Sequence, residues 1–195
     1  MREFAELYDE IDTTTATHLK VAAMARYFRG APPADAAWAA YILSGRRLKR
    51  FIEPALLRRW LVEASGLPEW LVDESYSTVG DVAESIALLM ETDESTKVAM
   101  DVPLTEWIDE RLPPLRDEDE ARQREAIVGW WRSLPYRECF LLNELLTGEL
   151  RAGAPELLVS RALSEALEVS RTDVARRMMG EWQPGVAFWE GLKTG

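Results

Sequence analysis

The sequence PYRECFLLNELLTGELRAGAP, residues 135–155, decides the fold class. After Pro135, apolar residues recur at the three- and four-residue spacing that places side chains on one face of a helix: Phe140, Leu141, Leu142, Leu145 and Leu146. Gly148 and Gly153 then interrupt the pattern, and Pro155 suits the first position of another helix. We therefore predict a helix over 136–146 at the centre of the core, followed by a two-glycine connection.

The same spacing recurs almost throughout the chain, and no stretch alternates apolar and β-branched residues between hairpin turns. Periodicity, proline and glycine predict helices over about 3–11, 17–28, 33–43, 54–65, 68–79, 82–90, 117–131, 136–146, 155–167 and 172–179. Asp81 is expected to cap the helix over 82–90, and Ser170 with Asp173 to cap the last one. The predicted fold is all-α, a two-lobed helical bundle of about ten helices.

The predicted lobes cover about 1–91 and 103–182, because the segment 92–102 between them is polar, acidic and without an apolar stripe. Residues 183–195 are expected to begin a linker to a further domain. The apolar content of 47% with 29% charged residues is ordinary for a soluble globular protein. No apolar run is long enough to span a membrane, and the first ten residues carry four acidic side chains where a signal peptide would be basic.

The single cysteine, Cys139, excludes an internal disulfide and favours a reducing compartment, so we expect a cytoplasmic protein. One histidine and one cysteine cannot build a His/Cys zinc site or a Cys-His catalytic pair. We expect His18 to be a solvated helix residue and Cys139 to be buried. The acidic run 117–120 fits the first turn of a helix better than a metal site, and the eight tryptophans fit the core better than base stacking.

The net charge of -11 opposes general nucleic-acid binding, which depends on basic side chains. The charge is unevenly distributed, however. The stretch 44–60 holds six basic residues against Glu53 alone, so it carries +5 and the remainder carries -16. A local basic face on an acidic body is therefore possible.

Two connections between helices are candidate phosphate-binding sites. The first, Ser44–Arg50, combines a glycine with Arg46, Arg47, Lys49 and Arg50, and its alternative is a solvated charged loop. The second, Leu146–Pro155, has glycines that permit close approach of the backbone to a groove or phosphate, and its alternative is a tight interhelical turn. No G-x-x-x-x-G-K-[ST] or G-x-G-x-x-G loop supports nucleotide binding of either common type.

The second connection resembles a known family. Its sequence L-T-G-E-L-R-A-G, residues 146–153, is similar to the L-x-G-x-L-R-x-G stretch of the DNA-binding domain of ATP-dependent DNA ligases. Residues 79–84, V-G-D-V-A-E, resemble the G-D-x-A-E turn of that family, and 13–28 resemble its opening helix pair. Residues 41–47, Y-I-L-S-G-R-R, are similar to Y-F-L-S-G-R-R of the bacterial branch, and 163–182 resemble its M-G-x-W ending. The resemblance covers about residues 1–182.

The resemblance implies a helical domain that grips nicked double-stranded DNA across the minor groove, mainly through phosphates. Carried over to this chain, minor-groove and backbone contacts fall on Gly80, Thr147, Gly148, Arg151 and Gly153. Charge and loop position add Arg46, Arg47, Lys49 and Arg50. Glu149 places an anion inside the contact loop, which weakens phosphate binding unless it faces solvent.

Ligases of this family adenylate the lysine of a K-x-D-G motif, and none of the four lysines here, Lys20, Lys49, Lys97 and Lys193, stands in one. We therefore expect no catalytic residues and no cofactor in this segment, which is either a piece of a longer ligase or a free-standing accessory domain. The parent ligase is expected to use ATP and Mg, and the expected partners are nicked DNA, the catalytic domains and repair proteins on the acidic face. The alternative is an acidic helical protein-interaction module without a DNA-binding role.

Overall fold

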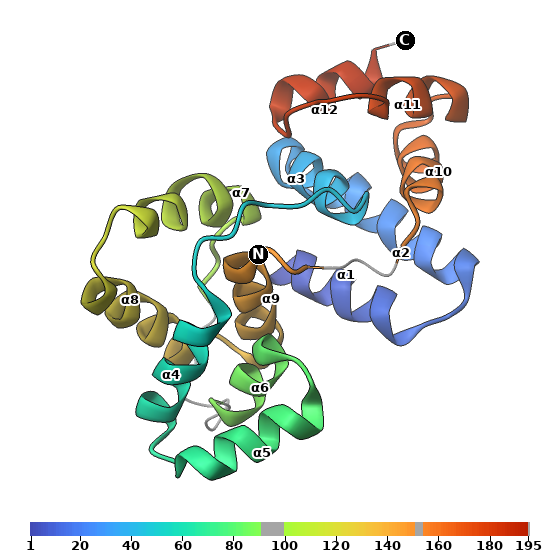
Figure 1. Ribbon diagram of the computed structural model, residues 1–195. Helices are drawn as coiled ribbons and strands as arrows, with labels where there is room; N and C mark the ends of the chain where they lie inside the picture. Colours follow the sequence, from blue (N-terminus) through green and yellow to red (C-terminus); the bar gives the residue numbers. More distant parts are fainter. Residues whose placement is uncertain (91–99, 151–153, 195) are drawn as a thin grey trace. The chain divides into compact units, whose positions relative to one another are not determined.

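The computed structural model describes residues 1–90, 100–150 and 154–194. Twelve α-helices, one π-helical turn and one 3-10 turn are formed by these residues, and none of them lies in a β-strand (Figure 1). The prediction of an all-α fold is confirmed. No helix within these ranges has the length and apolar character that a membrane span requires.

The chain forms two compact units, and neither is continuous in sequence. Unit 1 comprises Met1–Arg47, Pro103–Thr105 and Arg151–Gly195. It contains α1 (Arg2–Thr13), α2 (Thr17–Gly30), α3 (Pro33–Leu43), α10 (Glu156–Leu167), α11 (Arg171–Met178) and α12 (Val186–Lys193). Helix α2 packs against α10 and α1, and α12 packs against α3, so that the first and last parts of the chain share one core.

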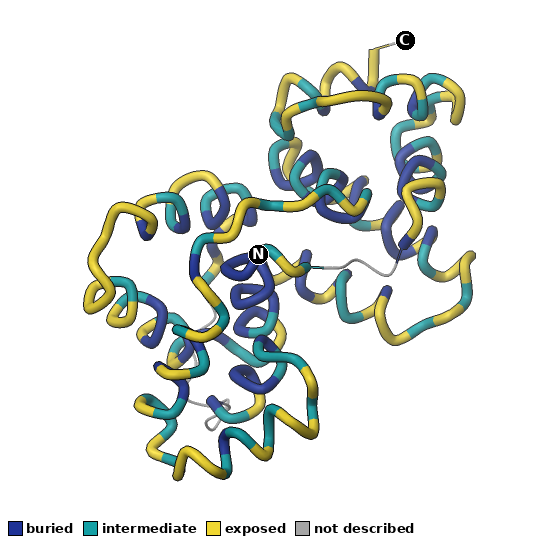
Figure 2. The backbone as a smooth tube through the Cα atoms, in the orientation of Figure 1, coloured by how far each residue is buried: buried dark blue, intermediate teal, exposed yellow. Residues whose placement is uncertain are grey.

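Unit 2 comprises Leu48–Val102 and Glu106–Leu150. Its helices are α4 (Pro54–Ser65), α5 (Glu69–Val79), α6 (Val82–Leu89), α8 (Glu120–Ser133) and α9 (Tyr136–Thr147). Helix α9 packs against α6, and α4 contacts α5, α6 and α8. Figure 2 shows a continuous run of buried backbone along α9, where the four leucines are fully buried and Phe140 is half-buried.

This division differs from the expected lobes at 1–91 and 103–182. Periodicity identifies which face of α2 is apolar, but the helix that covers it, α10, lies more than a hundred residues later in the chain. The segment 183–195, which is expected to begin a linker, contains α12, whose Trp189 and Leu192 are buried. Its role as a linker stays a prediction. The expected joining loop 92–102 lies largely outside the described residues.

Several helices begin and end at the capping residues and glycines that the sequence predicts. Gly66 and Gly80 end α4 and α5 in the left-handed conformation, with φ of 68° and 79°. The Asp81 side chain accepts a hydrogen bond from the Glu84 amide at the start of α6. Ser170 accepts from the Asp173 amide and donates to its carboxylate, forming the predicted start of α11.

The segment between Leu104 and Arg116 contains helical structure that the spacing of apolar residues does not predict. It forms α7 (Leu104–Glu106), a π-helical turn (Trp107–Arg111) and a 3-10 turn (Pro113–Arg116). Helix α8 then begins at Glu120, three residues after the expected start, with Asp119 as its N-cap. The delay follows from the 3-10 turn, which extends to Arg116 and is closed by the Asp117 amide donating to the Pro114 carbonyl oxygen, so that α8 begins only after it.

The buried carboxylate of Asp35 caps the start of α7. Asp35 on α3 accepts hydrogen bonds from the Leu104 amide at 3.1 Å, the Thr105 amide at 2.9 Å and the Thr105 hydroxyl at 2.6 Å. Asp35 therefore acts as an N-cap from a distant helix, and these three donors satisfy the charge that burial would otherwise penalise.

Most predictions about isolated side chains are confirmed. Cys139 is buried and His18 is exposed. Trp60, Trp107, Trp131 and Trp189 are buried, and Trp38, Trp130 and Trp182 are half-buried. Trp70 is the exception, with 69% of its surface exposed on α5.

Candidate nucleic-acid interface

The two predicted connections meet in unit 2, where residues 48–52 lie against the C-terminal end of α9. The amides of Phe51 and Ile52 donate to the carbonyl oxygen of Leu146, at 2.9 and 3.1 Å. Arg50 Nε donates to the carbonyl oxygen of Thr147 at 3.3 Å. The last carbonyl oxygens of a helix have no hydrogen-bond partner inside it, so these three donors cap α9. They also fix the path of residues 48–52, which are called the basic loop below.

Gly148 makes this close approach possible. It ends α9 with a φ of 67°, and a Cβ added to it would lie 2.7 Å from the carbonyl oxygen of Leu48 and 3.3 Å from the amide nitrogen of Arg50. Both neighbours are backbone atoms, which cannot move aside as a flexible side chain does. The left-handed conformation and the tight contact each require glycine at this position.

Thr147 is buried, with 2% of its surface exposed. Its hydroxyl donates within α9, to the carbonyl oxygens of Asn143 at 3.1 Å and Glu144 at 3.3 Å. The side chain therefore does not lie on the surface where we expected a contact. Its backbone carbonyl instead holds Arg50, which makes Thr147 a positioning residue for the basic loop.

Arg50 is surrounded by carboxylates. Its guanidinium lies 2.9 Å from Glu53 and 3.5 Å from Glu149, besides the hydrogen bond to α9. The Glu149 side chain is thus turned toward Arg50, which partly neutralises both groups. The anion that the sequence places inside the loop is therefore engaged by a neighbouring cation.

Lys49 and Arg116 lie beside each other in unit 2, and both are exposed. Arg116 Nη2 donates to the carbonyl oxygen of Lys49 at 3.2 Å, and its guanidinium carbon lies 4.1 Å from the centre of the Phe51 ring. Within the described residues neither cation forms an ion pair. Sequence reasoning missed Arg116, because 66 residues of sequence separate it from Arg50 and nothing marks its position in the fold.

Arg46 and Arg47 belong to unit 1, and their environments differ. Arg46 is half-buried and donates to the carbonyl oxygens of Met178 at 3.0 Å and Gly180 at 2.7 Å. Its guanidinium also lies 4.9 Å from the Trp182 ring centre. Arg46 therefore caps the end of α11, whereas Arg47 is exposed and has no ion pair within the described part of the chain.

The remaining two cations of the basic stretch join helices of unit 2. Arg58 binds Asp73 on α5, with Nε at 3.1 Å, and Arg59 pairs with Glu120 on α8. The hydrogen bond from Arg59 lowers the pKa of the Glu120 carboxyl. Arg124 and Glu63 form a second pair between α4 and α8 at 2.6 Å. Most basic side chains of residues 44–60 thus hold elements of the fold together. Among the described residues, Arg47 and Lys49 are the two of this stretch whose side chains form neither an ion pair nor a hydrogen bond.

The other predicted site residues fall into two groups. Gly80 is exposed at the turn between α5 and α6, and an added Cβ would meet no atom within 4 Å. Arg151 and Gly153 lie outside the described residues, so their predicted contacts stay predictions.

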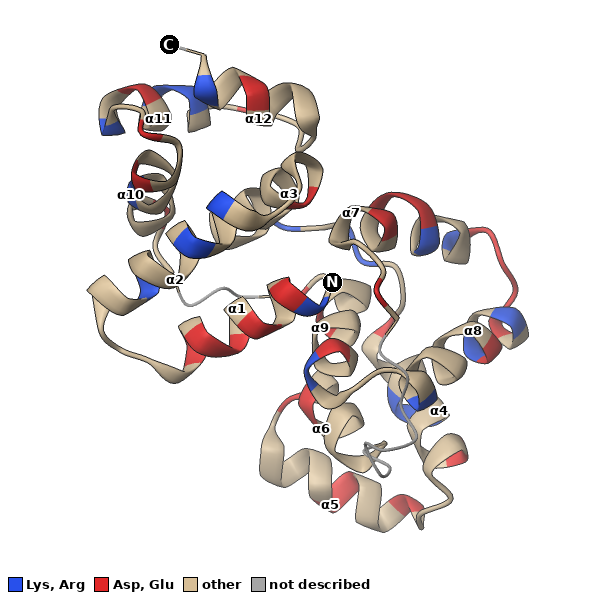
Figure 3. Ribbon diagram, turned by 180° about the vertical axis from the view of Figure 1, so that it is seen from behind, with Lys and Arg blue, Asp and Glu red and all other residues tan. Residues whose placement is uncertain are grey.

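Acidic residues predominate on α1, which carries Glu3, Glu6, Asp9, Glu10 and Asp12 (Figure 3). Glu3, Glu6 and Glu10 line a groove of about 240 Å³ between α1 and α2. Tyr27 also lines it, and burial raises the pKa of the Tyr27 phenol far above its ordinary value. Arg26 also lines the groove and pairs with Glu10, so the excess of negative charge there comes from Glu3 and Glu6.

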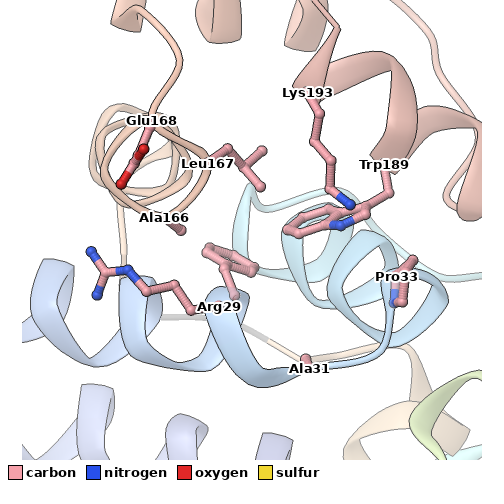
Figure 4. Close-up of a pocket in the computed structure, with 9 residues that line it drawn as sticks. Arg29, Ala31, Pro33, Ala166, Leu167, Glu168, Trp189 and Lys193 are labelled. Carbon is pink, nitrogen blue, oxygen red and sulfur yellow. The ribbon is translucent and has the colours of Figure 1, made fainter.

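A larger cavity of about 530 Å³ lies in unit 1 between α2, α10 and α12 (Figure 4). Its walls are mainly apolar, with Arg29 and Glu168 at one side and Lys193 extending toward Trp189 at the other. No described set of three or more His, Cys, Asp or Glu residues is arranged to hold a metal ion.

The fold and the site define an all-α protein in which a basic loop is fixed to the end of a buried helix by a tight glycine contact. Residues 1–164 match the family described as "DNA ligase N terminus", and the chain belongs to this family. No curated protein matches the chain. Helices α11 and α12 lie beyond the matched residues, so the resemblance of the M-G-x-W ending is not covered by the match.

Proposed function

We propose that the chain is the DNA-binding domain of an ATP-dependent DNA ligase of the bacterial branch, and that it grips nicked duplex DNA through the phosphate backbone and minor groove. The observation that carries the proposal is the family match over 1–164, which includes both connections that meet at α9. Phosphate contacts position a protein on a duplex without reading its sequence. Binding is therefore expected to be independent of sequence.

The geometry supports this role because the residues that hold the basic loop in place are different from the residue that is free to contact DNA. Gly148, Thr147 and Arg50 hold the basic loop against α9, and they leave Lys49 exposed on it. Because the loop is bonded at its backbone, little backbone entropy is lost when the Lys49 side chain meets a phosphate. The small number of unpaired cations and the charge of -11 predict modest affinity. Because the contacts are to phosphates, that affinity is expected to fall as salt rises.

ATP and Mg belong, in this proposal, to catalytic domains of the parent ligase. No lysine of this chain stands in a K-x-D-G motif, so the residues present do not fit the adenylated site. The chain by itself is expected neither to accept AMP nor to seal a nick. Its partners would be the nicked duplex and those catalytic domains.

Fluorescence anisotropy with nicked and intact duplexes across a salt series tests the proposal. We expect binding in the micromolar range that falls steeply as salt rises, and Arg151→Ala should weaken it similarly for unrelated sequences. Absence of binding at low salt would contradict a DNA-binding role for the isolated chain.

The acidic groove between α1 and α2 favours one further partner. Glu10 is paired with Arg26, whereas Glu3 and Glu6 provide a negative surface that suits a basic segment of another protein, such as a repair protein recruited to the ligase. Pull-down of a basic partner that is lost in Glu3→Lys with Glu6→Lys, while DNA binding persists, would support this addition. Partner binding without any DNA binding would instead favour the protein-interaction alternative.

A further inference from the structure

We infer that Arg116 is a phosphate-binding residue that acts together with Lys49, and this inference rests on the proposed function. The two side chains come from segments far apart in sequence, the basic loop and the 3-10 turn before α8. The hydrogen bond from the Arg116 guanidinium to the backbone carbonyl oxygen of Lys49 places the two residues on one patch of unit 2. The patch is defined here as Lys49, Phe51 and Arg116.

The contacts of Arg116 orient its guanidinium without using up its donors. One face lies over the Phe51 ring at 4.1 Å, and Nη2 donates to the Lys49 carbonyl oxygen at 3.2 Å. A guanidinium has five N–H donors in a planar fork, so several remain for a ligand. A cation held in this way binds a phosphate with less loss of side-chain entropy than a freely rotating one.

Acidic residues follow Arg116 directly, and most of them are already engaged. Glu118 pairs with Arg122 at 3.5 Å, Asp119 caps α8, and Glu120 binds Arg59. Arg116 itself forms no ion pair within the described residues, as is also true of exposed Asp117. Asp119 likewise forms no ion pair among the described residues, but its carboxylate accepts the Arg122 amide at the N-terminus of α8, where the helix dipole favours a negative charge. Lys49 and Arg116 are therefore cations without an ion pair in the described part of the chain, and both are available to an anionic ligand.

The test compares single and double neutral substitutions in the full chain by anisotropy with nicked duplex. Each phosphate contact contributes about 0.9 to the slope of log K against log salt, which corresponds to roughly eightfold in affinity at 0.1 M relative to 1 M salt. Arg116→Gln and Lys49→Gln should each reduce the slope by about 0.9, and the double variant by about twice that amount. Arg116→Lys should keep the slope, because the charge remains.

Arg122→Gln is the matched control, since Arg122 is exposed nearby but paired with Glu118. Thermal unfolding of every variant shows whether loss of the Phe51 contact disturbs the fold. An unchanged slope in Arg116→Gln, or an equal loss in Arg122→Gln, would overturn the inference while the proposed function stands. If the unaltered protein does not bind DNA at low salt, the proposed function fails, and the inference fails with it.

Discussion

Gly148 lies so close to Leu48 that any Cβ at position 148 would be 2.7 Å from the Leu48 carbonyl oxygen. The contact joins the end of α9 to the basic loop, backbone against backbone. Gly80 has the same left-handed conformation, with a φ of 79°, but has open space around it. The two glycines therefore separate the effect of backbone conformation from the effect of steric contact.

Gly80→Ala should lower the free energy of unfolding by about 1 kcal/mol, the cost of a left-handed alanine. Gly148→Ala should lower it by about 3 kcal/mol, because the loop must also move away from α9. Denaturant unfolding measures both differences. Equal losses in the two variants would show that the loop is not held by the contact at Gly148.

Arg46 and Arg47 should have different roles although they are neighbours in sequence. Arg46→Gln should lower the free energy of unfolding by about 1 to 2 kcal/mol, because two carbonyl oxygens at the end of α11 lose a charged donor. Arg47→Gln should leave stability unchanged and weaken DNA binding. Unfolding curves and anisotropy on both variants check this division, and a large loss of binding in folded Arg46→Gln would contradict it.

Glu149→Gln should strengthen DNA binding, by at least about twofold at low salt, because it releases Arg50 from one of its two carboxylates. Glu110→Gln, at an exposed position in the π-helical turn, makes the same change in net charge and serves as the control. If the two variants bind equally well, the gain comes from overall charge and not from Arg50.

The pair of Arg59 with Glu120 should make stability depend on pH in the acid range. Because the folded-state pKa of Glu120 is lowered, the pair stabilises the folded protein above the ordinary glutamate pKa, and this stabilisation is lost as pH falls through the lowered pKa. Unfolding free energies of the unaltered protein and Glu120→Gln should therefore differ at pH 7 and converge as pH falls through the lowered pKa of Glu120. A difference that does not shrink as the solution is acidified would exclude this mechanism.

The sequence predicts the local structure of this protein well, because its signals are local. Gly66 and Gly80 end helices as expected, and Ser170 starts α11 with the expected pair of hydrogen bonds. Helix α12 was missed because it has eight residues and no side-chain cap at its start. A short helix without a cap gives little signal in periodicity or composition.

Long-range relationships could not be predicted from the same signals. The basic stretch was identified from its charge, but the partners that decide each side chain's role are distant, such as Met178 for Arg46 and Asp73 for Arg58. The contact between Gly148 and Leu48 joins segments a hundred residues apart. Periodicity indicates which residues are apolar or charged, and only the fold shows what they meet.

The interleaved order of the two units has a consequence for the protein during its synthesis. Val21, Met24 and Phe28 on α2 are buried in unit 1, where α10 packs against that helix. A growing chain therefore carries an uncovered apolar helix near its beginning until more than a hundred further residues have been made. Unit 2, whose segments are separated by the three residues Pro103–Thr105, can complete its core earlier. We expect unit 2 to fold once residue 150 has left the ribosome, while the first helices still lack α10 and need a chaperone.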